Sequence, residues 1–491
     1  MSKPTKWSQF GVLVSVFFFW GFVAASNDIL IPVFREKLHL EPWQAQMVAF
    51  AFYVAYTVGS LIYVGWSKAV GGDLLNKIGY KNGIAIGLII SALGTLLFYP
   101  AAESESFPLM ISGLFIVGLG FSLQQTAANP LAIVMGDPKT GAQRLSLAGG
   151  VNNFGTTLGP VLVSFAIFGS VTSKNTVADI GAVKIPYLVL GAAFVIVALI
   201  FKFSSVPNKI DSVEEAPKDA SLTDYAATLP RKSPMNYPQL VLGMIGIFVY
   251  VGVEVATAAN LPQFMEEHLK TPEGLPFTAE KVAPYVSLYW ASLMMGRWTA
   301  SVGAFNLSSG VKSILRFVMP YLAFGVFLLI NVIANHDITP FYIYPVIILA
   351  LIIADLLSKG NPARQLLILS SFGIAALLIG MFSDGMISVY AFTSVGLFCS
   401  TLWPCIFTLA IAGLGRHTNA GSSYLIMMIM GGGILSLLQG WLAGPGVIGI
   451  QASFIVGVLC FAYLAFYAIK AKSILKTQGI DYDKLEGSGG H

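Results

Sequence analysis

The chain is a succession of long apolar runs separated by short polar segments. A run of about 20 apolar residues has the length of an α-helix that crosses the hydrocarbon core of a bilayer. Six runs precede a charged stretch at 204–236 and eight follow it, at 10–34, 43–66, 81–101, 108–135, 144–170, 185–203, 237–263, 283–305, 313–335, 340–358, 363–383, 386–415, 420–444 and 449–472. The pattern predicts an all-α polytopic membrane protein with fourteen spans.

The charged stretch at 204–236 is too long and too polar for a tight turn, so we interpret it as a cytoplasmic linker. It separates an N-terminal six-helix bundle at 1–203 from a C-terminal region at 237–472. Without the helical pair at about 313–358, six plus six spans remain, which is the pattern of two bundles related by a pseudo-two-fold axis. We expect this inserted pair to pack outside its bundle, with Asp355 hydrated near the inner surface.

The positions of Lys and Arg predict the orientation of the spans, because short cytoplasmic loops are enriched in these residues. With the N-terminus inside, the inner side holds Lys77, Lys81, Lys139, Arg144, Lys312, Arg316, Lys359, Arg364, Arg416, Lys470, Lys472 and Lys476. The outer loops hold Arg35, Lys37, Lys174, Lys184, Lys270 and Lys281. We therefore predict a multi-pass protein of the inner (plasma) membrane with both termini in the cytoplasm. The tail at 473–491 is basic and then rich in glycine, so we expect disorder there.

Composition narrows the possible functions. With 56% hydrophobic and 11% charged residues, the chain is too apolar for a soluble globular protein. Its net charge of +4 comes from scattered basic residues, which argues against a nucleic-acid partner. The cysteines lie in apolar runs and the five histidines lie in loops or in the tail, with no spacing typical of metal ligands or nucleophiles. We predict no enzyme activity, no metal and no cofactor, and a monomer whose partners are the lipid bilayer and a small molecule.

Apart from Asp355 in the inserted helical pair, two carboxylates interrupt the apolar spans. Asp28 lies in the first span and Glu254 in the seventh, and each precedes a similar proline-containing stretch, Ile31–Phe34 or Leu261–Phe264. A charged side chain in the hydrocarbon region is costly, so such residues usually face the bundle interior or a water-filled path. Asp28 could instead lie close enough to the outer surface to be hydrated. Both acids are our candidates for binding a proton or a sodium ion.

The fourth span carries three amides, Gln124, Gln125 and Asn129. Gln125 and Asn129 are four residues apart and share a helix face, where they could donate to and accept from a polyhydroxylated ligand. Amides in membrane spans also link helices by hydrogen bonds. The residues alone leave both interpretations open.

The loop after the second span resembles a signature of the major facilitator superfamily. The signature reads glycine, x, leucine, x, aspartate, basic, x, glycine, followed by basic residues, and the loop at Gly72–Gly83 follows it closely. Its glycines allow a tight turn and its basic residues hold the loop at the inner surface. Asn76 stands in place of the usual aspartate, so the charge that normally occupies that position is missing.

Four segments together resemble the fucose, galactose and glucose symporter family within that superfamily. They are Asn27–Pro32, Leu123–Pro130, Arg144–Gly155 and Gly421–Gly433. The resemblance covers nearly the whole chain apart from the insertions. It implies the major facilitator fold, with two six-helix bundles, and sugar uptake driven by a proton or sodium gradient.

Carried over to this chain, the resemblance assigns proton coupling and sugar binding to Asp28. Gln125 stands where fucose permease has a second acid, and Gly149 replaces a glutamine of the fucose permease site. Glu254 matches a Gly-x-Glu element of the glucose and galactose branch. These positions argue against fucose and favour glucose or galactose as the substrate.

Aromatic residues add further candidates, because an indole can stack on the apolar face of a pyranose. Trp20, Trp290 and Trp403 are the candidates, with Trp403 the strongest, although most aromatic residues in membranes face lipid or neighbouring helices. Arg297, near the inner end of the eighth span, is interpreted as a structural anchor. The complete set of predicted sugar ligands is Asn27, Gln124, Gln125, Asn129, Asn152, Asn153, Glu254, Trp290 and Trp403, with Asp28 and Glu254 as the coupling residues.

We interpret the chain as a secondary active transporter that takes up a neutral hexose with a cation, H⁺ or Na⁺, by alternating access. One alternative is a proton-driven exporter of drugs or metabolites, which would not require Asn129. Another is a transporter-like sugar sensor, although the sequence carries no appended signalling domain beyond the short linker.

Overall fold

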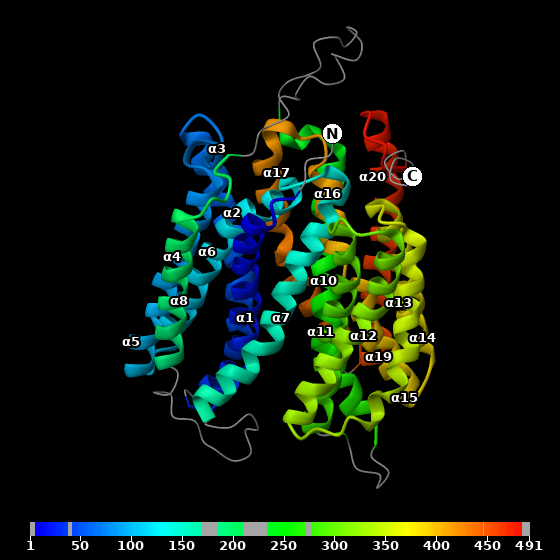
Figure 1. Cartoon of the computed structure of the whole chain (residues 1–491). Coiled ribbons are helices and arrows are strands. Elements are labelled where there is room, and N and C mark those ends of the chain that lie inside the picture. The colour runs from blue at the N-terminus through cyan, green and yellow to red at the C-terminus, as the bar shows by residue number, and fades with distance from the viewer. Residues whose placement is uncertain are drawn as a thin grey trace. The chain divides into compact units, whose positions relative to one another are not determined.

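The structure is a computed structural model that describes residues 5–37, 42–168, 184–209, 233–270, 277, 279–444 and 446–483. Every regular element in these ranges is helical (Figure 1). Contacts between the helices divide the chain into two compact units. Unit 1 contains residues 1–138, 151–215 and 415–428, and unit 2 contains residues 139–150, 216–414 and 429–491.

Unit 1 is built mainly from long apolar helices. They are α1 (Trp7–Lys37), α2 (Pro42–Ala69), the short α3 (Leu74–Ile78), α4 (Tyr80–Leu96), α5 (Phe98–Glu103), α6 (Phe107–Val134), most of α7 (Gly141–Phe168), α8 (Lys184–Phe203) and α17 (Thr418–Met427). Within the unit, α4 packs against α6 and α8, and α2 packs against α6 (Figure 1). Helix α17 lies on α2 and α6, although it comes from the C-terminal part of the sequence.

Unit 2 contains the remaining helices and the first turns of α7. They are α10 (Pro238–His268), α11 (Ala279–Ser301), α12 (Ser309–Ile333), α13 (Tyr344–Ser358), α14 (Pro362–Phe382), α15 (Gly385–Cys399), α16 (Leu402–Ile411), α18 (Gly431–Leu442), α19 (Ile450–Ser453) and α20 (Ile455–Thr477). Short 3₁₀ turns lie at Pro138–Thr140, Pro234–Asn236, Val302–Ala304, Thr339–Ile343, Gly415–His417 and Met428–Met430.

The helix pairings of unit 2 repeat those of unit 1. Helix α14 packs against α15 and α20 as α4 packs against α6 and α8, and α11 packs against α15 as α2 packs against α6. Helices α12 and α13 have no counterpart in this scheme, and α12 packs mainly on α11. The predicted bundle boundaries at 1–203 and 237–472, with the linker at 204–236 and the insertion at 313–358, stay a prediction. The two units differ from them, because residues 139–150 and 415–428 group with the other part of the chain.

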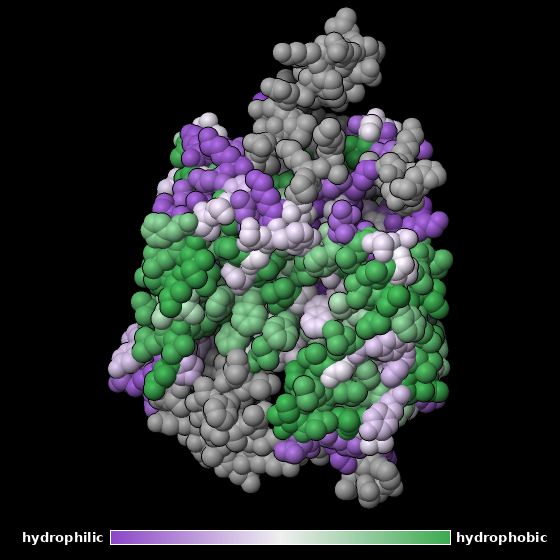
Figure 2. Space-filling model, in the orientation of Figure 1, coloured by the Kyte–Doolittle hydropathy of each residue, from purple (hydrophilic) through white to green (hydrophobic). Residues whose placement is uncertain are grey.

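Within the described residues, eleven helices are long and apolar enough to cross a membrane. The predicted all-α class is confirmed, whereas the count of fourteen spans stays a prediction. Helices α7 and α11 are not among the eleven, and they carry polar residues such as Arg144, Asn152 and Arg297. On the visible face of each unit, hydrophobic residues cover the middle of the helices and hydrophilic residues gather at their ends (Figure 2).

The turn between α13 and α14 shows how local sequence sets these boundaries. Lys359 and Gly360 adopt φ values of +51° and +74°, which end α13. Asn361 then caps α14, because its side-chain oxygen accepts hydrogen bonds from the backbone N–H groups of Ala363 and Arg364 at 3.1 and 3.2 Å. The two helices are therefore joined by a very short connection.

Asp355 on α13 is buried, so the expectation that it is hydrated is wrong. Its side chain is 6% exposed and lies 3.5 Å from Nε of Arg316 on α12. The reason is that Arg316, the single arginine of α12, packs against Asp355 near the end of α13. The sequence alone suggested that this position would be exposed to water. This ion pair joins the two helices near their ends at Ser309 and Ser358.

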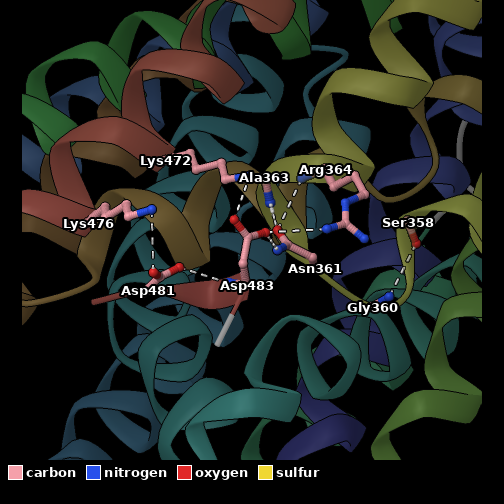
Figure 3. A network of polar contacts seen from close by, with 9 residues as sticks. All are labelled: Ser358, Gly360, Asn361, Ala363, Arg364, Lys472, Lys476, Asp481 and Asp483. Carbon is pink, nitrogen blue, oxygen red and sulfur yellow. Dashed lines mark hydrogen bonds and ion pairs between the residues drawn. The ribbon is translucent and has the colours of Figure 1, made fainter. Parts of the chain in front are cut away.

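The C-terminal segment is ordered further than expected. Helix α20 continues to Thr477, and residues up to Asp483 pack on the ends of other helices, so the expectation of disorder is wrong for 473–483. Asp483 lies among Asn361, Arg364 and Lys472, with distances of 3.1, 3.3 and 2.7 Å (Figure 3). Residues 484–491 lie outside the described part of the chain.

Candidate functional site

Two neighbouring glutamines of α6 have different roles. Gln124 is fully buried, where its Oε1 accepts a 2.8 Å hydrogen bond from Nε1 of Trp20 and its Nε2 donates to Oγ of Ser91 at 3.0 Å. Its amide therefore joins α6 to α1 and α4. Gln124 was a predicted sugar ligand, and the contacts described here make it a helix-linking residue in this conformation.

Gln125 is only partly buried and lies on a different side of α6. Its Nε2 donates to the hydroxyl of Tyr56 on α2 at 2.9 Å. Asn129, one turn later and 2% exposed, donates its side-chain N–H to the backbone carbonyl of Gln125 at 3.0 Å. Gln125, Asn129 and Tyr56 thus form one polar cluster between α2 and α6. Sequence reasoning missed Tyr56, because a tyrosine in an apolar span gives no signal without its neighbour.

One amide of α7, that of Asn152, lies where this helix approaches α1. Nδ2 of Asn152 donates to the backbone carbonyl of Phe17 at 3.0 Å, and Gly155 lies against the backbone of Phe18. Asn153 is buried, with 4% of its surface exposed. Gly155 permits close contact between α7 and α1, and the hydrogen bond from Asn152 stabilises this contact.

The predicted residues Asn27 and Asp28 lie in α1, whose helical backbone the structure describes. Their side chains lie outside the described part of the structure. The roles given to these two residues therefore rest on the sequence.

The charged site of unit 2 joins α10 to α11. Nη2 of Arg297 lies 3.8 Å from Oε1 of Glu254, and the two side chains are 11% and 13% exposed. The hydroxyl of Tyr289 donates to the backbone carbonyl of Glu254 at 2.8 Å, and Nη2 of Arg297 donates to the hydroxyl of Tyr250 at 3.4 Å. The acid predicted from sequence is therefore paired with an arginine that the sequence had indicated only as an anchor.

Trp403 and Trp290, two of the predicted sugar-stacking residues, lie in different surroundings. The ring of Trp403 on α16 lies 6.2 Å from that of Tyr250 and 5.8 Å from that of Phe407, next to the charged site. Trp290 is 37% exposed and meets Tyr289 edge to face. The structure thus brings Trp403 together with Glu254 through Tyr250.

The signature loop retains a carboxylate at a different position. Asp73 caps α3, accepting from the backbone N–H of Asn76 at 3.1 Å, and it also accepts from the hydroxyl of Tyr63 at 3.0 Å. Asn419 of α17 donates to Asp73 and to the side-chain oxygen of Asn76 at 2.8 and 3.0 Å. Gly79, with φ of +89°, turns the chain into α4. The charge missing at Asn76 is therefore supplied three residues earlier.

Comparison of the sequence with known proteins identifies the family of this chain. The chain belongs to the Major Facilitator Superfamily, whose sequence pattern matches residues 10–354. It is 34% identical to the glucose/galactose transporter of Brucella abortus, covering 93% of this chain and 92% of that protein. It is 30% identical to a putative glucose/galactose transporter of Helicobacter pylori, covering 96% and 98%. The L-fucose-proton symporter of Escherichia coli is 28% identical, covering 94% and 92%.

The fold is also similar to that of a solved transporter. A crystal structure of the Escherichia coli fucose:proton symporter FucP matches with a TM-score of 0.68 and 24% sequence identity, covering 94% of this chain and 98% of that one. These findings confirm the predicted all-helical major facilitator fold and a transporter class in place of an enzyme class.

Proposed function

We propose that this protein couples a cation gradient to the uptake of a neutral hexose, glucose or galactose, by alternating access. The observation that carries the proposal is the Glu254–Arg297 pair, a charged site largely removed from water inside apolar helices. Ionisable residues in such places are costly and usually serve a substrate or ion path. The relatives named glucose/galactose transporter and L-fucose-proton symporter support the substrate class.

The roles of the site residues follow from their chemistry. Asp28 carries the coupling cation and Glu254 assists it, because carboxylate oxygens accept a proton or a hard cation such as Na⁺. Gln125 and Asn129 offer amide groups to sugar hydroxyls, and Trp403 offers an aromatic face beside the charged site. Asn27, Asn152, Asn153 and Trp290 complete the proposed set of sugar ligands.

The proposed setting is the inner membrane, with the protein acting as a monomer in the lipid bilayer. Both termini lie on the cytoplasmic side in this proposal. Its support is the distribution of Lys and Arg over the short loops, together with the length of the apolar helices.

Uptake of labelled glucose and galactose into proteoliposomes tests the proposal. A sodium or proton gradient is imposed separately, and the intact protein is compared with Asp28→Asn and Gln125→Ala. Accumulation above the outside concentration under one gradient, lost in Asp28→Asn, identifies the ion and supports symport. Equilibration of sugar under both gradients, without accumulation, would contradict cation coupling. Accumulation that persists in Asp28→Asn would contradict the role given to that residue.

A further inference from the structure

The polar cluster between α2 and α6 holds two side-chain amides by their nitrogen ends. Nε2 of Gln125 donates to the hydroxyl of Tyr56 at 2.9 Å, and Nδ2 of Asn129 donates to the backbone carbonyl of Gln125 at 3.0 Å. Because a backbone carbonyl only accepts hydrogen bonds, the second contact requires the nitrogen of Asn129 to face the helix backbone. The oxygens of both amides are the atoms that these contacts do not use.

The hydroxyl of Tyr56 is a fixed point on α2. The tyrosine is buried, and its ring meets that of Phe52 edge to face at 5.5 Å. Oγ of Ser122 on α6 donates to the backbone carbonyl of Tyr56 at 3.1 Å. The terminal torsion of a glutamine has a broad, roughly two-fold preference, so either end of its amide can face a ligand. The contact with Tyr56 therefore decides which end of Gln125 does so.

The orientation of an amide determines which ligand groups it recognises. Its nitrogen donates hydrogen bonds and its oxygen accepts them. With both nitrogens held by protein groups, the oxygens of Gln125 and Asn129 form a pair of acceptors one helical turn apart. Such a pair complements the O–H groups of a sugar. A ligand without the matching hydrogen leaves an acceptor unpaired, and sites built around hydrogen bonds reject such ligands strongly.

We propose that Tyr56 is a positioning residue that turns the oxygen of the Gln125 amide towards the sugar, so that Gln125 and Asn129 accept hydrogen bonds from its hydroxyl groups. The inference rests on the proposed uptake of a hexose and deepens it, because it states which chemical group the ligand must offer at this place. Tyr56 acts through Gln125 and does not itself touch the sugar. No covalent bond changes.

A purely structural role for Tyr56 predicts a different result. If the tyrosine only held α2 against α6, loss of its hydroxyl would weaken the binding of all ligands by a similar factor. A positioning role instead changes how well the site distinguishes a hydroxyl group from a group that cannot donate. The test therefore measures discrimination between ligands as well as affinity.

Fluorinated sugars provide this measurement. In each monodeoxyfluoroglucose one hydroxyl is replaced by fluorine, which cannot donate a hydrogen bond. The analogues compete with labelled glucose for uptake into proteoliposomes, and the fluorine penalty is the half-inhibitory concentration of an analogue divided by that of glucose. We expect a wild-type penalty of about tenfold at one position or more, abolished at that position in Gln125→Ala. The absence of any penalty that depends on Gln125 would overturn the proposal.

Tyr56→Phe removes the hydroxyl oxygen and keeps the ring beside Phe52. Either end of the Gln125 amide can then face the sugar, so the penalty at the Gln125-dependent position should fall to about threefold. Glucose itself should also require a higher concentration for half-maximal uptake. A penalty equal to that of the wild type would contradict the positioning role. An equal fall at positions that do not depend on Gln125 would also contradict it.

Ser122→Ala is the matched control. It also removes a hydrogen bond between α2 and α6 at Tyr56, but it leaves the tyrosine hydroxyl and both amides in place. The fluorine penalty should therefore stay at its wild-type value. A fall as large as that in Tyr56→Phe would mean that helix spacing sets the discrimination, which is incompatible with the proposal.

Gln125→Glu supplies a second variant that leaves Tyr56 intact. Both oxygens of an ionised carboxylate accept hydrogen bonds, so the end that faces the sugar stays an acceptor. The same fluorinated position should therefore keep its penalty. A penalty that appears at a new position only in Gln125→Glu would mean that the wild-type glutamine presents its nitrogen, and the proposed orientation would be wrong.

The outcome also separates this inference from the proposed function. If the wild type takes up glucose or galactose and the fluorine penalty does not depend on Tyr56, only the positioning role is wrong. If the wild type takes up neither sugar, the proposed function is wrong and the inference falls with it. Elution of each variant as a single species in detergent verifies folding before uptake is measured.

Discussion

Asn419 donates a 2.8 Å hydrogen bond to the carboxylate of Asp73, which joins the start of α17 to the loop that precedes α4. The same carboxylate accepts from Tyr63 and caps α3. The signature position itself holds Asn76, which contributes a neutral acceptor to Asn419. The negative charge of the signature loop therefore lies at Asp73 and not at position 76. Its carboxylate contacts α17, a helix more than three hundred residues away in the sequence.

Asp73→Asn should lower the stability of unit 1 against unfolding. It replaces an ionised acceptor of several hydrogen bonds, and bonds to charged groups contribute roughly 2 kcal/mol each. Thermal unfolding in detergent should show a clear loss of stability. Asp384→Asn is the matched control, since Asp384 also occupies a helix N-cap but makes no side-chain capping bond there. Equal losses in the two variants would contradict the role of Asp73.

Gln124 and Gln125 should respond differently to the same substitution. Gln124→Ala leaves the indole N–H of Trp20 unpaired in a buried place, which costs about 1 to 3 kcal/mol of stability. Gln125→Ala removes a hydrogen bond to the buried hydroxyl of Tyr56, so it should cost about 1 kcal/mol of stability. It should also raise the sugar concentration for half-maximal uptake, by about tenfold for one lost polar contact. Thermal unfolding and uptake kinetics on both variants distinguish these outcomes. A stable Gln124→Ala with impaired sugar affinity would reverse the assignment.

The Arg316–Asp355 pair should be sensitive to single changes and tolerant of a double one. Removing one partner leaves a buried charge uncompensated, at a cost of about 3 kcal/mol. Arg316→Met with Asp355→Leu removes both charges and keeps similar volumes, so stability should return close to that of the wild type. A double-mutant cycle by thermal or denaturant unfolding measures the coupling. If the loss of stability in the double variant equals the sum of the losses in the two single variants, the predicted coupling between Arg316 and Asp355 is wrong.

The contacts of the C-terminal segment should depend on pH. A hydrogen bond from Lys472, with further attraction from Arg364 and Lys476, lowers the pKa of Asp483 below its ordinary value. A carboxyl whose pKa is lowered by folding adds stability above its unfolded pKa, about 4, and loses it as the pH falls towards the folded value. Since the group is partly exposed, the contribution is at most about 1 kcal/mol.

Amide exchange of residues 478–483 measures this effect. Protection factors, which correct for the intrinsic pH dependence of exchange, should be higher at pH 7 than below pH 4, and Asp483→Asn should lower them at pH 7. Burial raises the pKa of Tyr482 to about 12, so that residue stays neutral over this range. Protection that is identical in Asp483→Asn and wild type would show that these ion pairs do not hold the segment.

The fold was predictable from the sequence because apolar runs of helical length allow few alternatives in a bilayer. The direction in which a residue points was not predictable in the same way. Helix α6 is apolar on all sides, so no periodicity distinguishes Gln124, which links helices, from Gln125, which faces Tyr56. The intramembrane acid Glu254 gave a sequence signal because a charge is rare in such surroundings.

The partners of charged residues were harder to predict than the charges. Glu254 and Arg297 lie on different helices, and only the packing of α10 on α11 brings them to 3.8 Å. Asp355 was misinterpreted for the same reason, since Arg316 on α12 covers it. The side chain of Asp28, which the sequence predicts to bind the coupling cation, lies outside the described part of the structure, so its role stays a prediction.

The distribution of chain segments between the two units has a consequence for experiments on fragments. A cut in the stretch at 204–236 would leave residues 139–150 on the first fragment and 415–428 on the second, although each segment packs with the other unit. Neither fragment would contain a complete set of packing partners. Expressed alone, each should therefore be short-lived in the cell, whereas co-expression should rescue both, because each fragment supplies the segment that the other lacks.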